Sequence, residues 1–115
     1  MSDYIVYHNP RCTKSRQALA YLDERNQSYH VVDYLKEPLS TETLKSVLVQ
    51  LGMKPEELLR KGEVTFKEQF KGKSFSDDEW IQAMIDFPKL MERPIVVKNN
   101  KAVVARPTES IDNLG

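Results

Sequence analysis

The chain lacks a second cysteine: Cys12 is the only cysteine among its 115 residues. An internal disulfide framework is therefore excluded, and the composition is typical of a reducing compartment. Any disulfide or thiol-adduct chemistry at Cys12 must be completed by a thiol from another molecule. The two histidines, His8 and His30, and the lone cysteine also lack the spacing of zinc ligands, so no metal is expected.

The chain also lacks an excess of one charge and a long apolar run. Its 17 Lys and Arg residues balance 17 Asp and Glu residues, so no basic field indicates a nucleic acid or an anionic membrane as partner. No apolar run approaches the roughly 18 residues that span a bilayer. Residues 1–4 lack the basic and apolar regions of a signal peptide. We expect a cytoplasmic protein with one domain, residues 1–115, and one hydrophobic core.

The order of local patterns predicts the fold class. Two β-favouring runs flank a helix-like segment at the start, and two strands around an Asn-Asn turn precede a short helix at the end. These segments are residues 4–7, 13–25, 29–34, 95–97, 102–105 and 106–109. This order is that of a thioredoxin-like α/β domain, in which a βαβ unit and a ββα unit share one mixed sheet. A helical insertion at about residues 40–90 would separate them, and Pro94, before the third strand, is the candidate for a cis bond.

Within the insertion, local signals mark where helices begin. Ser40 is a good N-cap, and Pro55 fits the first turn of a short helix. The spacing Ser76-Asp77-Asp78-Glu79 predicts a capping box at the start of a further helix. Residues 61–73 are polar and mixed. The candidates for burial among them are Val64, Phe66 and Phe70.

Cys12 lies in the segment HNPRCTKSR, between the first predicted strand and the first predicted helix. At a helix N-terminus, unpaired backbone N–H groups and the helix dipole stabilise a thiolate and attract an oxyanion. The Ser15 hydroxyl, one helical turn further on, could donate a hydrogen bond to the sulfur. The neighbours that could lower the pKa of the thiol are His8, Arg11, Lys14 and Arg16. The alternative, a small buried hydrophobe, is disfavoured by the polar flanking residues.

Four segments together resemble one known family. They are HNPRCTKSR at residues 8–16, Leu58-Leu59-Arg60, Arg93-Pro94-Ile95-Val96-Val97 and Arg106-Pro107. In order and spacing they resemble the glutaredoxin-linked arsenate reductases, thioredoxin-fold proteins with an HNPxCxxSR cysteine loop. The resemblance implies that Cys12 is the catalytic nucleophile. It also implies that three guanidinium groups surround the oxyanion, those of Arg60, Arg93 and Arg106.

The resemblance further implies the reaction and the partners. Arsenate would form a covalent adduct with Cys12, glutathione would act as co-substrate, and a glutaredoxin would complete the reduction to arsenite. No bound cofactor or metal would be needed. Arsenate is a multiply charged anion, and guanidinium groups suit it because they stay charged and offer several directed donors.

Two functions of other kinds stay open on the sequence. Spx-type regulators share the arsenate-reductase-like fold and bind RNA polymerase, often with a Cys-x-x-Cys switch, but Ser15 stands here in place of the second cysteine. A monothiol glutaredoxin-like protein would exchange glutathione with protein disulfides through Cys12 alone. Arsenate-dependent consumption of thiol would distinguish the enzyme from both alternatives.

Overall fold

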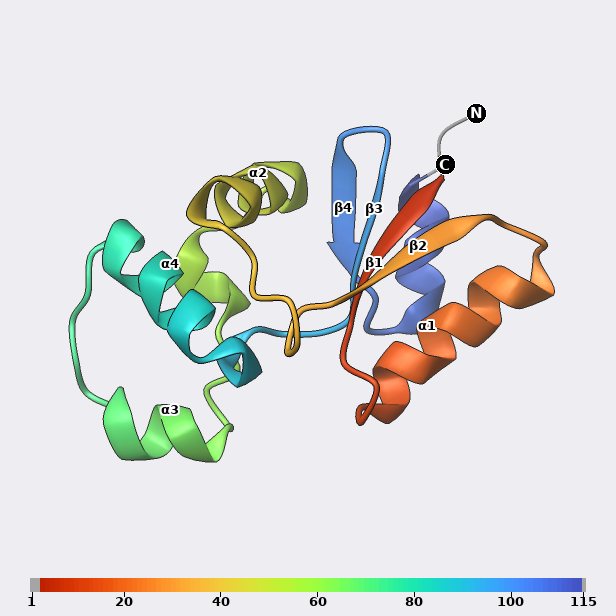
Figure 1. Ribbon diagram of the computed structural model, residues 1–115. Coiled ribbons are helices and arrows are strands. Elements are labelled where there is room, and N and C mark those ends of the chain that lie inside the picture. Colours follow the sequence, from red (N-terminus) through yellow and green to blue (C-terminus); the bar gives the residue numbers. More distant parts are fainter. Residues whose placement is uncertain (1–2, 115) are drawn as a thin grey trace. The chain divides into compact units, whose positions relative to one another are not determined.

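The chain divides into two compact units in the computed structural model, which describes residues 3–114 (Figure 1). One unit contains residues 3–37 and 93–114, and the other contains residues 38–92. The second unit agrees with the predicted helical insertion to within two residues at each end. The insertion therefore forms a compact unit of its own. Within residues 3–114, no helix has both the length and the apolar character that crossing a membrane requires.

The first unit is built on a four-stranded mixed sheet with the strand order β2-β1-β3-β4. Its strands are β1 (Tyr4–His8), β2 (Tyr29–Asp33), β3 (Ile95–Lys98) and β4 (Lys101–Val104). β1 pairs in parallel with β2 and antiparallel with β3, and β3 pairs antiparallel with β4. The predicted α/β class and mixed sheet are confirmed, and the central strand β1 leads directly to the Cys12 segment.

Two helical elements, α1 (Thr13–Glu24) and η3 (Thr108–Leu114), pack on one face of this sheet (Figure 1). The apolar side chains that they bury with the sheet form one cluster. Its members are Tyr4, Val6, Ala18, Leu22, Val96, Ala105, Ile111 and Leu114. Each fully buried Val, Leu or Ile contributes about 1.5–3 kcal/mol. This packing fixes α1 against the sheet and therefore fixes the first turn of the helix, where Cys12 stands.

The predicted hairpin between β3 and β4 is confirmed. Asn99 and Asn100 form its turn with φ angles of 53° and 64°. Both values lie in the left-handed region, which a two-residue hairpin turn requires at its central positions and which asparagine tolerates.

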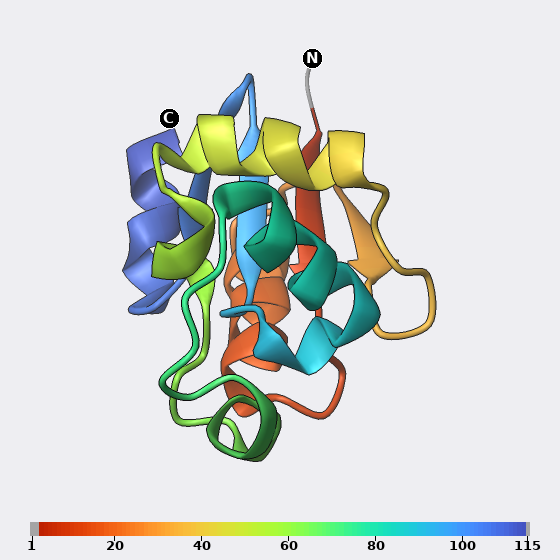
Figure 2. The same cartoon turned by 90° about the vertical axis from the view of Figure 1, so that its left-hand side faces the viewer.

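The second unit is helical (Figure 2). Its elements are α2 (Thr41–Leu51), η1 (Pro55–Leu58), α3 (Val64–Gln69), α4 (Asp77–Asp86) and η2 (Pro88–Leu90). The predicted start signals are confirmed at three positions. The Ser40 side chain accepts a hydrogen bond from Thr43 N–H, Pro55 lies in the first turn of η1, and Ser76 opens α4 with a capping box.

The prediction for residues 61–73 was wrong in part. This stretch contains the helix α3, and Val64 at its start is 61% exposed rather than buried. Phe70 is buried, as predicted. Its ring lies 5.6–6.0 Å from three other aromatic rings, those of Phe75, Trp80 and Phe87. The segment is therefore anchored by aromatic contacts with later residues rather than by an apolar stripe of its own.

The capping box of α4 gives a stability prediction. Ser76 Oγ accepts a hydrogen bond from Glu79 N–H at 3.2 Å, and Glu79 Oε1 accepts one from Ser76 N–H at 2.9 Å. We expect Ser76→Ala to lower the free energy of unfolding by about 1 kcal/mol, measured by urea unfolding. Ser74→Ala is the matched control, because Ser74 is exposed and outside the helix. Equal losses in the two variants would contradict a capping role for Ser76.

Candidate active site

Cys12 is the N-cap residue of α1, with extended backbone angles of φ −96° and ψ 124°. A short turn connects it to the end of β1. In this turn Cys12 N–H donates to Asn9 O at 2.9 Å, and Arg11 N–H donates to Asn9 Oδ1 at 3.0 Å. An asparagine side chain that accepts from the backbone two residues further on is typical of a tight turn. The turn formed by Asn9 and Pro10 therefore places the thiol at the N-terminus of α1.

The environment of Cys12 favours the thiolate. Burial acts to raise the pKa of this thiol, whose residue is only 8% exposed. The backbone N–H groups of Ser15 and Lys14 and the Arg93 guanidinium outweigh burial, so the pKa lies below its ordinary value. The Cys12 side chain makes no capping hydrogen bond of good geometry, so we take the two amides to act mainly as oriented dipoles. A thiolate is the reactive form of cysteine.

Ser15 is fully buried and supports the site through its backbone as well as its side chain. Its hydroxyl oxygen accepts a hydrogen bond from Asn9 N–H at 3.3 Å, which ties the first turn of α1 to the Asn9 turn. Its own backbone N–H lowers the pKa of Cys12. Donation from the Ser15 hydroxyl to the sulfur stays a prediction. The loop-fixing contact with Asn9 was not foreseen from the sequence.

His8 is buried at the end of β1, opposite Asp33 of β2 in the strand register. Burial lowers the pKa of His8, the Asp33 carboxylate acts to raise it, and Arg16 acts to lower it, with a net decrease. The imidazole is therefore mainly neutral at neutral pH and brings little positive charge toward Cys12. Its Nδ1 atom is buried and makes no hydrogen bond to residues 3–114. Support of the thiolate by His8 stays a prediction.

Arg93 is the cation that the structure brings to Cys12. Its guanidinium lowers the pKa of the thiol both by its charge and by a side-chain hydrogen bond. The Arg93–Pro94 peptide bond, the one for which a cis form was predicted, is cis, and so is the Arg106–Pro107 bond. Arg106 follows β4 in the same unit, with its side chain exposed. A role for Arg106 in binding an anion stays a prediction.

Arg60 belongs to the second unit and is engaged by two carboxylates. Its guanidinium donates to Lys89 O at 3.1 Å and pairs with Glu63 Oε2 at 3.6 Å and Glu92 Oε1 at 3.9 Å. An antiparallel bridge between Leu59 and Met91 holds this arrangement. The sequence did not indicate these partners. A role for Arg60 at an oxyanion site stays a prediction, and an anion there would compete with two carboxylates.

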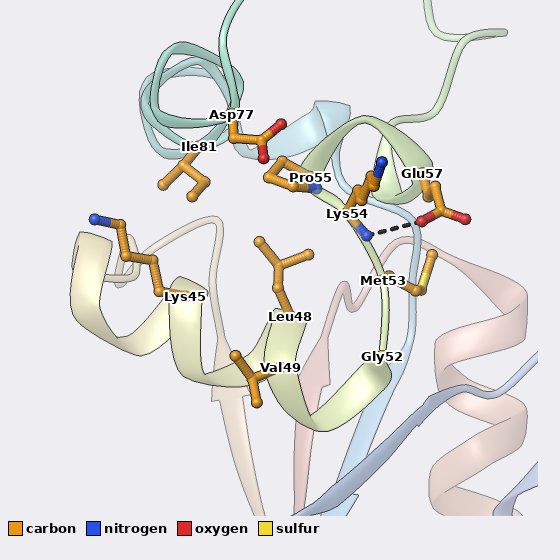
Figure 3. Close-up of a pocket in the computed structure, with 10 residues that line it drawn as sticks. All are labelled: Lys45, Leu48, Val49, Gly52, Met53, Lys54, Pro55, Glu57, Asp77 and Ile81. Atoms are coloured by element: carbon orange, nitrogen blue, oxygen red, sulfur yellow. Dashed lines mark hydrogen bonds between the residues drawn. The ribbon is translucent and has the colours of Figure 1, made fainter.

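A pocket of about 570 Å³ lies elsewhere, within the second unit (Figure 3). Leu48 and Ile81 point toward each other across it, and charged residues stand at its edge. None of the ten residues that line it is a cysteine, a histidine or an arginine. It therefore offers no thiol and no guanidinium.

The fold and the Cys12 site define a thioredoxin-like α/β protein with a reactive cysteine at a helix N-terminus. Residues 7–114 match the ArsC family, and the chain belongs to it. An arsenate reductase from Vibrio cholerae has a similar structure, with a TM-score of 0.94 and 40% identity over 99% of this chain and 98% of that one.

Curated relatives are similar over nearly their whole length. An arsenate reductase of Neisseria meningitidis is 39% identical and is aligned over 97% of both chains. An uncharacterised protein of Escherichia coli, YfgD, is 48% identical over 92% of this chain and 91% of its own length. The predicted family and fold are therefore confirmed.

Proposed function

We propose that this protein is an arsenate reductase that uses glutathione and a glutaredoxin, with Cys12 as the nucleophile. The observation that carries the proposal is the position of Cys12 at the N-terminus of α1, where the amides of the first helical turn and the Arg93 guanidinium lower the pKa of its thiol. The same groups suit an oxyanion, because a helix N-terminus and a guanidinium both bind negative charge. Support comes from the relatives of Vibrio and Neisseria, which are named arsenate reductases.

In the first step, the Cys12 thiolate attacks arsenic(V). A sulfur–arsenic bond forms and one arsenic–oxygen bond breaks, and the departing oxygen leaves as water after it takes up protons, one of them originally on the thiol. Arsenic keeps its oxidation state in this step. Arg93 opposes the repulsion between the thiolate and the anion and stabilises charge on the arsenate oxygens. Arg60 and Arg106 complete the anion site in the proposal.

In the second stage, arsenic is reduced by two electrons. The thiol of glutathione replaces a further arsenic-bound oxygen, which leaves as water. A glutaredoxin thiolate then attacks the sulfur of the bound glutathione, forms a mixed disulfide and leaves the electron pair of the broken bond on arsenic. Hydrolysis releases arsenite and free Cys12, and a second glutathione regenerates the glutaredoxin as glutathione disulfide forms. The cycle consumes two glutathione molecules for each arsenate.

The test is arsenate-dependent oxidation of NADPH in a mixture of the protein, glutathione, glutathione reductase and a glutaredoxin. We expect oxidation that stops when arsenate, glutathione or glutaredoxin is omitted, because each supplies an atom or an electron pair. Oxidation that is the same without arsenate would contradict the proposal.

Two outcomes would favour other functions. Reduction of a generic glutathione mixed disulfide without any response to arsenate would indicate a monothiol glutaredoxin-like exchange protein. Stable binding of RNA polymerase without arsenate-dependent thiol consumption would indicate an Spx-like regulator.

A further inference from the structure

Three basic residues near Cys12 in the sequence have no role in the proposed reaction. Arg11, Lys14 and Arg16 flank the cysteine in the sequence, yet the cation that lowers its pKa is Arg93. All three have exposed side chains, and none forms an ion pair with a carboxylate of residues 3–114. Arg16 is partly occupied, since it donates to Thr13 Oγ1 at 3.2 Å. Arg11 and Lys14 therefore carry solvent-exposed charge that no carboxylate of residues 3–114 pairs with, and they lie one and two positions from Cys12 in the chain.

This segment carries a charge excess that the whole chain does not have. The protein has a formal net charge of zero, whereas residues 4–22 contain these three cations and no Asp or Glu. The first turn of α1 likewise contains no acidic residue. Exposed charges act over about 10 Å at an ionic strength of 0.1 M. Arg11 is the neighbour of Cys12, and Lys14 is two residues away, so a molecule that reaches the sulfur must enter the field of both.

We propose that Arg11 and Lys14 select a small, negatively charged thiol as the molecule that reacts at Cys12. The inference rests on the proposed function only in taking Cys12 as the reacting thiol and glutathione as the natural partner. Cys12 is 8% exposed, so a compact molecule reaches the sulfur with less obstruction than a thiol held on a globular surface. Carboxylates on that molecule pair with Arg11 and Lys14, because guanidinium and ammonium groups both donate charged hydrogen bonds to carboxylate oxygens.

The experiment measures the charge preference directly, without arsenate. Cys12 is first converted to its mixed disulfide with 2-thiopyridine, and release of thiopyridone is followed after addition of a thiol. The incoming thiolate forms a new disulfide with Cys12, while thiopyridone leaves with the electron pair of the broken S–S bond and takes up a proton. Three thiols are compared at low ionic strength: glutathione, which is anionic, 2-mercaptoethanol, which is neutral, and cysteamine, which is cationic.

The expected result is a reversal of preference. In the double variant Arg11→Glu and Lys14→Glu, glutathione should react about tenfold more slowly and cysteamine about tenfold faster at low salt. 2-Mercaptoethanol, which reacts as a singly charged thiolate, should be slowed less than glutathione. Addition of 0.5 M salt should remove most of the difference between the thiols. Single neutral variants, Arg11→Gln and Lys14→Gln, should each shift the ratio of the glutathione and cysteamine rates by about threefold. Lys101→Glu, which reverses an exposed charge on β4 of the same unit, is the control and should leave this ratio unchanged.

Four outcomes would overturn the inference. An unchanged ratio of the glutathione and cysteamine rates would show that the cations do not act on the thiol, and equal slowing of all three thiols would indicate structural damage. Slower reduction by a glutaredoxin with an unchanged ratio for small thiols would mean that the cations meet a protein surface. Because arsenate is absent from the assay, a failure of the arsenate reductase proposal would leave this result intact. A Cys12 that forms no mixed disulfide at all would overturn both proposals.

Discussion

Cys12→Ser is expected to reduce arsenate-dependent NADPH oxidation to the level seen without the protein, a loss of more than about a thousandfold. A serine hydroxyl stays protonated at neutral pH, so the amides of Ser15 and Lys14 and the Arg93 guanidinium would have no anion to stabilise. With no other cysteine in the chain, no second thiol can take over the reaction. The measurement is the glutathione and glutaredoxin assay with equal amounts of the two proteins.

The fold of this variant should be intact. The contacts that hold position 12 are made by the backbone: its N–H donates to Asn9 O at 2.9 Å, and its carbonyl accepts from Arg16 N–H at 3.1 Å. Serine is also a better N-cap residue than most. We therefore expect a free energy of unfolding within about 1 kcal/mol of the parent protein, from urea unfolding. Retained turnover in a correctly folded variant would remove Cys12 as the nucleophile.

Local signals predicted most of the fold, because the elements begin and end where short-range chemistry requires. The Asn99-Asn100 turn, the Ser40 cap and the Ser76 capping box each depend on residues within a few positions of one another. The helix α3 was missed because its stability comes from Phe70, whose aromatic partners lie up to 17 residues further along the chain. The hydrophobic periodicity of residues 61–73 does not reveal contacts with residues outside that stretch.

The candidate site also depends on contacts between residues that are far apart in the sequence, which local patterns do not reveal. Sequence reasoning identified Cys12 and the helix N-terminus, since both belong to one segment. It assigned the lowering of the pKa partly to neighbours such as Arg11 and Lys14, but the cation that acts is Arg93, 81 positions away. Only the family resemblance indicated Arg93. The pairing of Arg60 with Glu92 was not predictable for the same reason, because the bridge between Leu59 and Met91 brings these distant residues together.

Arg93→Ala is expected to raise the pKa of Cys12 and to weaken arsenate handling together. Arg93 lowers this pKa by its charge and by a hydrogen bond, and a hydrogen bond to a charged group contributes about 1.5–3 kcal/mol. At neutral pH the variant should therefore contain less thiolate and react more slowly with an alkylating reagent. Above the raised pKa the thiolate fraction recovers, so the alkylation rate should recover as well. The measurement is the pH profile of iodoacetamide alkylation, whose midpoint should move upward.

Arsenate handling should respond differently from alkylation, because Arg93 has a second task in the proposal. The loss of kcat/KM for arsenate should be about 10- to 100-fold at neutral pH. It should persist at high pH, where alkylation has recovered, since the bound anion still lacks its guanidinium. Arg93→Lys separates charge from geometry: it should keep part of the pKa shift and less of the arsenate affinity, because an ammonium lacks the planar fork of donors. Arg25→Ala, at the far end of α1 with its guanidinium over the Tyr21 ring, is the control. A loss that vanishes once Cys12 is fully ionised would limit Arg93 to tuning the thiol and remove it from the anion site.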